Sequence, residues 1–191
     1  MGVSAHPFAM SFHPYDARIT TRYDEKNLFQ SLFGAIHETG HALYDQGLPY
    51  ENFGTPLAEN ISLGIHESQS RLWENLVGRS KLFWKFFYPK LREIFPEPFN
   101  KIDFDVFYNA VNSVNPSLIR VEADECTYNL HIIMRFEIEK SLIEGAIDVA
   151  DLPKIWNERT KAYLGLDVPD DASGVLQDVH LEAVGPDAAA D

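Results

Sequence analysis

Residues 28–44 have the sequence LFQSLFGAIHETGHALY. Apolar residues recur in this segment at intervals of three and four, which is the spacing of one face of an amphipathic helix. The segment contains HETGH at residues 37–41, so two histidines four positions apart share a face of the predicted helix. Ring nitrogens at this spacing can bind a single metal ion. We therefore expect His37 and His41 to be metal ligands, with Glu38 rotated by about 100° and placed beside metal-bound water.

The alternative interpretation of this segment is two solvated histidines around an ordinary helix glutamate. Gly40 argues for a special environment, because glycine in a helix interior costs about 1 kcal/mol relative to alanine. We interpret it as a position of close packing or close approach by another part of the chain. On that interpretation the metal site is the stronger hypothesis.

A catalytic zinc site usually has three protein ligands and one open position for water. The extended motif with a third histidine is excluded, because Tyr44 and Gly47 occupy the positions that its glycine and histidine require. A glutamate from a second helix is the other common solution. Spacing slightly favours Glu67, near the start of the next predicted helix, and its neighbour His66 is a rival. Three glutamates remain open at this point, namely Glu59, Glu67 and Glu74.

The remainder of the chain predicts a mostly helical protein with a minor extended part. A short strand is expected at residues 19–23, before the first helix, which Gly47 ends. Ser80 is expected to cap a helix that Pro89 breaks or kinks, and Asp151 to cap the last one. The other predicted helices cover residues 65–77, 103–111 and 122–144.

Composition excludes several classes of protein. The 191 residues include 16 Lys and Arg against 29 Asp and Glu, giving a net charge of −13, so we expect no nucleic-acid partner. No apolar run approaches the length of about 20 residues that a membrane-spanning helix needs, and we expect no membrane partner. The first residues do not resemble a secretory signal. The single cysteine, Cys126, fits a reducing compartment, and we expect a cytoplasmic protein.

Six short motifs occur in order along the chain, and together they span residues 6–180. They are HPF at 6–8, DARIT at 16–20, HETGH at 37–41, HESQS at 66–70, IRVEAD at 119–124 and GVLQDVH at 174–180. This series resembles the thermostable, Taq-type metallocarboxypeptidases, whose motif set is HPF, DxRxT, HExxH, HES(Q/G), I(R/A)xxAD and GxxQDxHW. Six ordered motifs are far more specific than HExxH alone.

The resemblance implies a mostly α, zincin-like catalytic core with a small β-sheet beside the metal-binding helix. It implies one divalent metal, zinc or alternatively cobalt, and an enzyme that releases single residues from peptides with a free C-terminus. Matched position by position, His37, His41 and Glu67 correspond to the metal ligands and Glu38 to the general base and acid. Three further residues fall in motifs associated with the substrate cleft, namely Arg18, Arg120 and His180.

The expected chemistry gives these cleft residues separate roles. A metal lowers the pKa of its bound water to about 7, and Glu38 takes the proton and returns it to the leaving amine. His180 is the candidate donor to the developing oxyanion. Arg120 or Arg18 would bind the substrate carboxylate through paired hydrogen bonds. The alternative for each arginine is an ordinary ion pair with nearby acids, which are Glu122 and Asp124 for Arg120 and Asp16 for Arg18. Either Asp16 or Asp124 could instead orient a ligand histidine.

The chain departs from the family pattern at its ends. Leu181 stands where the last motif has tryptophan, and family members carry further segments on both sides. We expect a single core at residues 1–180, incomplete at both ends, followed by a tail at 181–191. A non-catalytic metal-binding fragment, or a subunit completed by another chain, is therefore the alternative function. Burial by helix packing is the default for the aromatic cluster Phe83–Tyr88. The cluster is also the most obvious candidate for an uncovered apolar face, which would favour a homo-oligomer such as a dimer.

Overall fold

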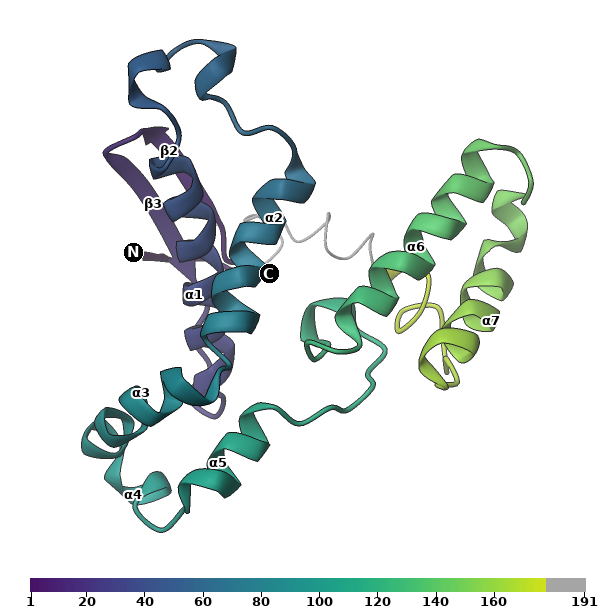
Figure 1. Cartoon of the computed structure of the whole chain (residues 1–191). Helices are drawn as coiled ribbons and strands as arrows, with labels where there is room; N and C mark the ends of the chain where they lie inside the picture. The colour runs from purple at the N-terminus through teal and green to yellow at the C-terminus, as the bar shows by residue number, and fades with distance from the viewer. Residues whose placement is uncertain (178–191) are drawn as a thin grey trace, which may run out of the picture. The chain divides into compact units, whose positions relative to one another are not determined.

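The computed structural model describes residues 1–177 and is drawn in Figure 1. The chain divides into two compact units, Met1–Tyr108 and Asn109 onward. Within the described residues, no helix is both long and apolar enough to cross a membrane. The single core at residues 1–180 stays a prediction, and the predicted tail lies outside the described residues.

The first unit begins with a small sheet of three strands, β1 (Gly2–Val3), β2 (Ala9–His13) and β3 (Asp16–Thr21). The strand order is β1-β3-β2, with β1 parallel and β2 antiparallel to β3. Helix α1 (Leu28–Gln46) packs beside β2 and β3 (Figure 1). Thr21 is fully buried, and its hydroxyl donates to the carbonyl of Ser31 on α1 at 3.2 Å. A sheet beside the helix that carries HETGH was expected, and it is confirmed.

Two helices of the first unit lie side by side, and both have side-chain caps. The α1 helix starts after Asn27, whose side chain accepts from the amide of Gln30, and ends at Gly47 as predicted. Two short 3-10 turns, Tyr50–Asn52 and Pro56–Ala58, precede α2 (Leu63–Arg71). The cap of α2 is Ser62, whose hydroxyl accepts from the amide of Ile65.

The helix predicted to end at Gly78 changes type before it ends. Residues Leu72–Val77 are π-helical, and the amide of Gly78 donates to the carbonyl of Trp73, five residues back. A π-turn holds more residues than an α-turn, and such turns are frequent at functional sites. The π-helical segment carries Glu74.

Gly40 marks the closest approach of α1 to α2. A methyl group on Gly40 would lie 2.6 Å from the Cα of Ser70 and 2.8 Å from the carbonyl oxygen of Gln69. Both contacts are with backbone atoms, so no side-chain rotation would relieve them. Ser70 is fully buried at this point. Close approach at Gly40 was predicted from the sequence, and the neighbour is now identified as the middle of α2.

The first unit also has an aromatic core, apart from the contact of α1 with α2 at Gly40. It joins α1 to α3 (Lys81–Ile94), α4 (Pro96–Phe99) and the start of α5 (Phe104–Val111). The ring of Phe107 lies 4.8 Å from Trp84 and 4.3 Å from Tyr88 between centroids. Ser80 caps α3 as predicted. The helix continues through Pro89 instead of breaking, because Pro89 and Lys85 both lie on its exposed face, where water can replace the lost backbone bond.

The second unit is built on α6 (Tyr128–Ile143) and α7 (Leu152–Leu164), with 3-10 turns at Arg120–Glu122 and Val149–Asp151. The two helices pack through a buried core of Met134, Ile138 and Trp156. Glycines in the left-handed region, Gly145 and Gly165, follow the two helices.

Two predicted details of the second unit differ in the structure. The α6 helix begins six residues later than the predicted start at Glu122. Asp124 accounts for the delay, because its carboxylate accepts from the amides of Cys126 and Thr127 and holds a turn there. Asp151 occupies the N-cap position of α7, but its side chain makes no capping hydrogen bond.

We predict that Gly40→Ala destabilises the protein by about 1–3 kcal/mol, because the added methyl group forces α1 and α2 apart. Urea unfolding followed by circular dichroism would measure the change. The matched control is Gly64→Ala on the exposed first turn of α2, where a methyl group meets only the hydroxyl of Ser62 at 3.9 Å. That control should be neutral or stabilising. Equal stability of the two variants would contradict the proposed constraint.

Candidate metal centre

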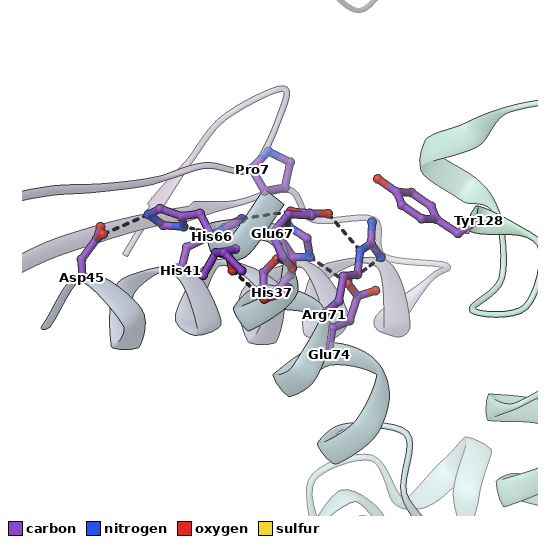
Figure 2. Close-up of polar contacts among 12 residues, drawn as sticks. Pro7, His37, His41, Asp45, His66, Glu67, Arg71, Glu74 and Tyr128 are labelled. Atoms are coloured by element: carbon purple, nitrogen blue, oxygen red, sulfur yellow. Dashed lines mark hydrogen bonds and ion pairs between the residues drawn. The ribbon is translucent and has the colours of Figure 1, made fainter. Parts of the chain in front are cut away.

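Three side chains from α1 and α2 converge on one point (Figure 2). His37 and His41 project from adjacent turns of α1, and Glu67 projects from α2 toward both of them. Oε2 of Glu67 lies 3.5 Å from Nε2 of His37 and 3.4 Å from Nε2 of His41. One potential ligand atom from each residue falls within 4.8 Å of the others. Within residues 1–177, no other three His, Cys, Asp or Glu residues form such a group.

These separations suit a tetrahedral metal site. Ligand atoms about 2 Å from a tetrahedral ion lie about 3.3 Å from one another. The two distances from Glu67 are close to that value. Two imidazoles and a carboxylate are also the ligand set of many catalytic zinc sites, in which the fourth position remains open. The group therefore fits a divalent metal in both geometry and ligand chemistry.

A carboxylate and an arginine support the first histidine. Nδ1 of His37 lies 2.8 Å from Oε2 of Glu74, in the π-helical segment. Arg71 donates to the same oxygen of Glu74 at 2.9 Å and, through Nε, to Oε1 of Glu67 at 3.0 Å. One guanidinium thus holds both carboxylates in place, as Figure 2 shows.

These contacts move the pKa values of the group in opposite directions. Burial, the largest single effect on His37, lowers its pKa, but hydrogen bonds and charges from Glu67 and Glu74 outweigh it and raise the pKa to about 9. Burial likewise would raise the pKa of Glu67, but its contacts with His37 and His41 and the charges of His37 and Arg71 hold that pKa well below its usual range. Glu67 is therefore ionised, as a metal ligand must be.

A different pair supports the second histidine. Nδ1 of His41 lies 2.6 Å from Nδ1 of His66, and Nε2 of His66 lies 2.9 Å from Oδ1 of Asp45. His66, the rival of Glu67 in the sequence, therefore points away from the ligand group and toward Asp45 (Figure 2). Of the other glutamates considered, Glu74 contacts His37 through the nitrogen that faces away from the group. Glu59 is not part of the group and lines a pocket together with His66 and Asp45.

Glu38 is buried on α1 between the two histidines in sequence. Burial is the main reason that its pKa is raised, and the charges of His37, His41 and His6 oppose that rise without cancelling it. A raised pKa makes the carboxylate a stronger base.

The predicted cleft residues have different surroundings. Arg18 is exposed and forms a two-bond ion pair with Asp16, which is the alternative considered from the sequence. Arg120 belongs to the second unit, where it donates to the hydroxyl of Tyr128 at 3.0 Å. Its Nε is buried and has no hydrogen-bond partner within residues 1–177. His180 lies outside the described residues.

The two acids considered as supports of a ligand histidine have local partners instead. Asp16 pairs with Arg18, and Asp124 holds the turn before α6.

Sequence reasoning missed the residues that do support the ligands. Asp45 could have been found, because it lies four residues after His41 and so on the same face of α1. Arg71 has the same relation to Glu67 on α2. Glu74 could not be assigned, because its side-chain direction depends on the π-turn.

The sequence profile of the carboxypeptidase Taq (M32) metallopeptidases matches residues 1–184 of this chain. The chain belongs to the M32 family. The family resemblance seen in the six motifs is therefore confirmed. Membership of a metallopeptidase family also implies a divalent metal, in agreement with the ligand group on α1 and α2.

M32 relatives share both sequence and fold with the chain. Thermostable carboxypeptidase 1 of Thermus thermophilus is 53% identical over 93% of this chain, and carboxypeptidase 1 of Bacillus subtilis is 50% identical over the same share. The structure of the M32 carboxypeptidase of Deinococcus radiodurans is 48% identical and superposes with a TM-score of 0.90 over 93% of the chain. The aligned parts are only 34%, 35% and 36% of these relatives. The chain thus spans about a third of their length.

We predict that Glu67→Ala lowers zinc affinity by more than about 100-fold, because losing a ligand should cost more than losing a supporting residue. Competition with a chromophoric chelator would measure the affinity. The matched control is Glu59→Ala, which removes a glutamate that does not contact the group and should bind zinc as the wild type does. Wild-type affinity in Glu67→Ala would mean that another residue supplies the third ligand.

Proposed function

We propose that this chain carries the catalytic core of a metallocarboxypeptidase that releases single residues from the C-termini of peptides. The observation that carries the proposal is a buried glutamate, Glu38, on the same helix as two histidines that converge with Glu67. We propose His37, His41 and Glu67 as the ligands of one divalent metal, with zinc as the first choice and cobalt as the alternative. The activity of the M32 relatives supports this proposal.

The chemistry divides between the metal and the protein. A bound divalent metal supplies a Lewis acid that polarises the scissile carbonyl and makes water acidic near neutral pH. A carboxylate oxygen of Glu38 accepts the proton of the attacking water. The same oxygen then returns that proton to the nitrogen of the leaving amine. Its raised pKa suits both steps, because a group that must take and release a proton works best near the operating pH.

An exopeptidase must also recognise the free carboxylate of its substrate. We propose Arg120 for this role, because its guanidinium has a neutral partner in Tyr128 and a buried Nε without a hydrogen-bond partner among residues 1–177. Arg18 remains a second proposal, although Asp16 already occupies two of its donors. His180 is proposed as the donor to the oxyanion on the strength of its motif alone.

A second function remains open: a metal-binding subunit that does not catalyse peptide hydrolysis without another chain. The exposed side chains of α3 favour it. Trp84 and Tyr88 of the predicted aromatic cluster are buried, but Leu82 and Phe86 are 79% and 61% exposed.

The same exposed face supports a proposal about assembly. A homo-oligomer, with a dimer as its simplest form, would cover Leu82, Phe86 and Phe87, since large apolar side chains that cluster on a surface commonly mark an interface. We also propose a cytoplasmic location, on the single cysteine of the sequence.

We predict that Glu38→Gln retains zinc and loses about 100- to 10,000-fold in peptidase activity, because glutamine has the shape of glutamate but cannot accept the proton. Release of the C-terminal amino acid from a short peptide would measure activity, and metal analysis of the same sample would measure zinc.

The comparison of zinc content with activity separates the two functions. Near wild-type activity in zinc-loaded Glu38→Gln would contradict the role of Glu38. A wild-type chain that binds zinc at the proposed ligands and releases no amino acid would favour the metal-binding subunit. A wild-type chain that binds no divalent metal would contradict both functions.

We predict that Arg120→Ala lowers kcat/KM about 10- to 100-fold for peptides with a free C-terminus. For amidated peptides we expect kcat/KM to change little. The expected loss is that of a charge-assisted hydrogen-bonded pair, about 1.5–3 kcal/mol. The matched control is Arg159→Ala, which removes an arginine of the same unit that pairs with Glu137 on the surface. Equal losses on free and amidated peptides would instead indicate a structural role for Arg120.

A further inference from the structure

A line of three polar side chains leads away from the metal centre, starting at the Nδ1 side of His41. It runs from His41 on α1 to His66 on α2 and back to Asp45 on α1 (Figure 2). Nδ1 of His41 and Nδ1 of His66 are 2.6 Å apart, and Nε2 of His66 and Oδ1 of Asp45 are 2.9 Å apart. All three side chains are largely shielded, with 17–18% of the surface of each exposed.

The chemistry of these groups decides the direction of each hydrogen bond. An ionised carboxylate only accepts, so Nε2 of His66 donates to Asp45. A neutral imidazole has one donor and one acceptor nitrogen, so Nδ1 of His66 accepts. The remaining partner, Nδ1 of His41, must therefore donate. Nε2 of His41 then keeps its lone pair, and this is the nitrogen that lies 3.4 Å from Glu67 in the ligand group.

The opposite arrangement does not give a metal ligand. If Nδ1 of His41 accepted, the proton of its neutral ring would sit on Nε2, and that nitrogen could not bind a metal. His66 would also have to donate from both nitrogens as a charged ring. The line of contacts is thus compatible with a metal at Nε2 of His41 in one tautomer only.

The ring of His66 is held on a third side as well. Tyr44 meets it edge to face, with 5.0 Å between the ring centroids. His41 and Asp45, which also contact the ring, are four residues apart and therefore lie about one helical turn apart on α1. His41 contacts it at 4.7 Å between centroids. Three residues of one helix, His41, Tyr44 and Asp45, therefore surround one ring from α2 and fix its orientation.

We propose that His66, held by Asp45, is a positioning residue that sets the tautomer of His41 and presents Nε2 of that ring to the metal. The proposal rests on the metal centre proposed above. It gives the two ligand histidines different supports, since His37 is held directly by the carboxylate of Glu74 and His41 is held by a carboxylate through a second imidazole.

Zinc affinity is the first test, measured by competition with a chromophoric chelator. We expect His66→Ala to lower zinc affinity about 10- to 100-fold, the usual cost of losing a group that orients a ligand. We expect His66→Gln to restore most of it, because an amide offers an acceptor for His41 and a donor for Asp45 side by side. The matched control is His13→Ala, since His13 lines the same pocket of about 230 Å³ as His66 and Asp45 and should leave zinc affinity unchanged.

Nitrogen-15 NMR of the histidine rings is the second test, and it reads the tautomer directly. In the zinc-loaded wild type we expect the proton of His41 on Nδ1 and that of His66 on Nε2. In zinc-free His66→Ala, at a pH where the rings are neutral, we expect His41 to become a mixture of both tautomers. A purely structural role of His66 would change stability without changing the tautomer of His41.

Several results would overturn the proposal. Unchanged zinc affinity in folded His66→Ala, equal losses in His66→Ala and His66→Gln, or a proton on Nε2 of His41 in the wild type would each do so. If His66→Ala fails to fold, the tautomers of the wild type decide. If the wild type binds no zinc, the proposed metal centre fails, and the tautomers of the zinc-free wild type with neutral rings still test the link from Asp45 to His41.

Discussion

The contact between the backbones of α1 and α2 at Gly40 is the constraint on which the centre depends. Because Gly40 has no side chain, the α2 backbone at Gln69 and Ser70 can lie against α1 between the turns that carry His37 and His41. Glu67 then reaches both histidines from a helix that is separate in sequence. A wider spacing of the helices would move the carboxylate away from both rings at once. One missing methyl group therefore controls the geometry of the whole ligand group.

The ligand residues have hydrogen-bond partners on α1, α2 and the π-helical segment, and these partners are themselves hydrogen-bonded. Each ligand histidine has its Nδ1 occupied, by Glu74 in one case and by His66 in the other. Arg71 joins Glu67 to Glu74, so the supports of two ligands share one cation. Such networks are costly when one member is unpaired and rigid when every member is paired. All of these groups come from α1, α2 and the π-helical segment that extends α2.

The sequence predicted the elements that have a strong local signal. The period of residues 28–44 and the pair His37 and His41 predicted the helix and the face that carries the ligands. Ser80 predicted the start of one helix, and Gly47 the end of another. Spacing alone left Glu59, Glu67 and Glu74 as alternatives, because the position of α2 against α1 is a tertiary property. The resemblance in motifs, rather than periodicity, selected Glu67. Asp45 shares a helix face with His41, and Arg71 with Glu67, which is a signal in the sequence. The role of Asp45 was still missed, because its partner His66 lies on the other helix.

The π-helical segment Leu72–Val77 has a consequence for how the chain could change in length. A segment of this kind holds one residue more than an α-helix of the same rise. The extra residue therefore shifts the direction in which all later side chains of the helix point. Removing one residue there would restore regular winding and rotate every later side chain by about 100° relative to Glu67. Trp84 would then turn away from Phe33 of α1, and the aromatic core would lose its packing against the helix that carries the ligand histidines. A single extra residue thus sets the orientation of the aromatic half of the first unit relative to its metal-binding half.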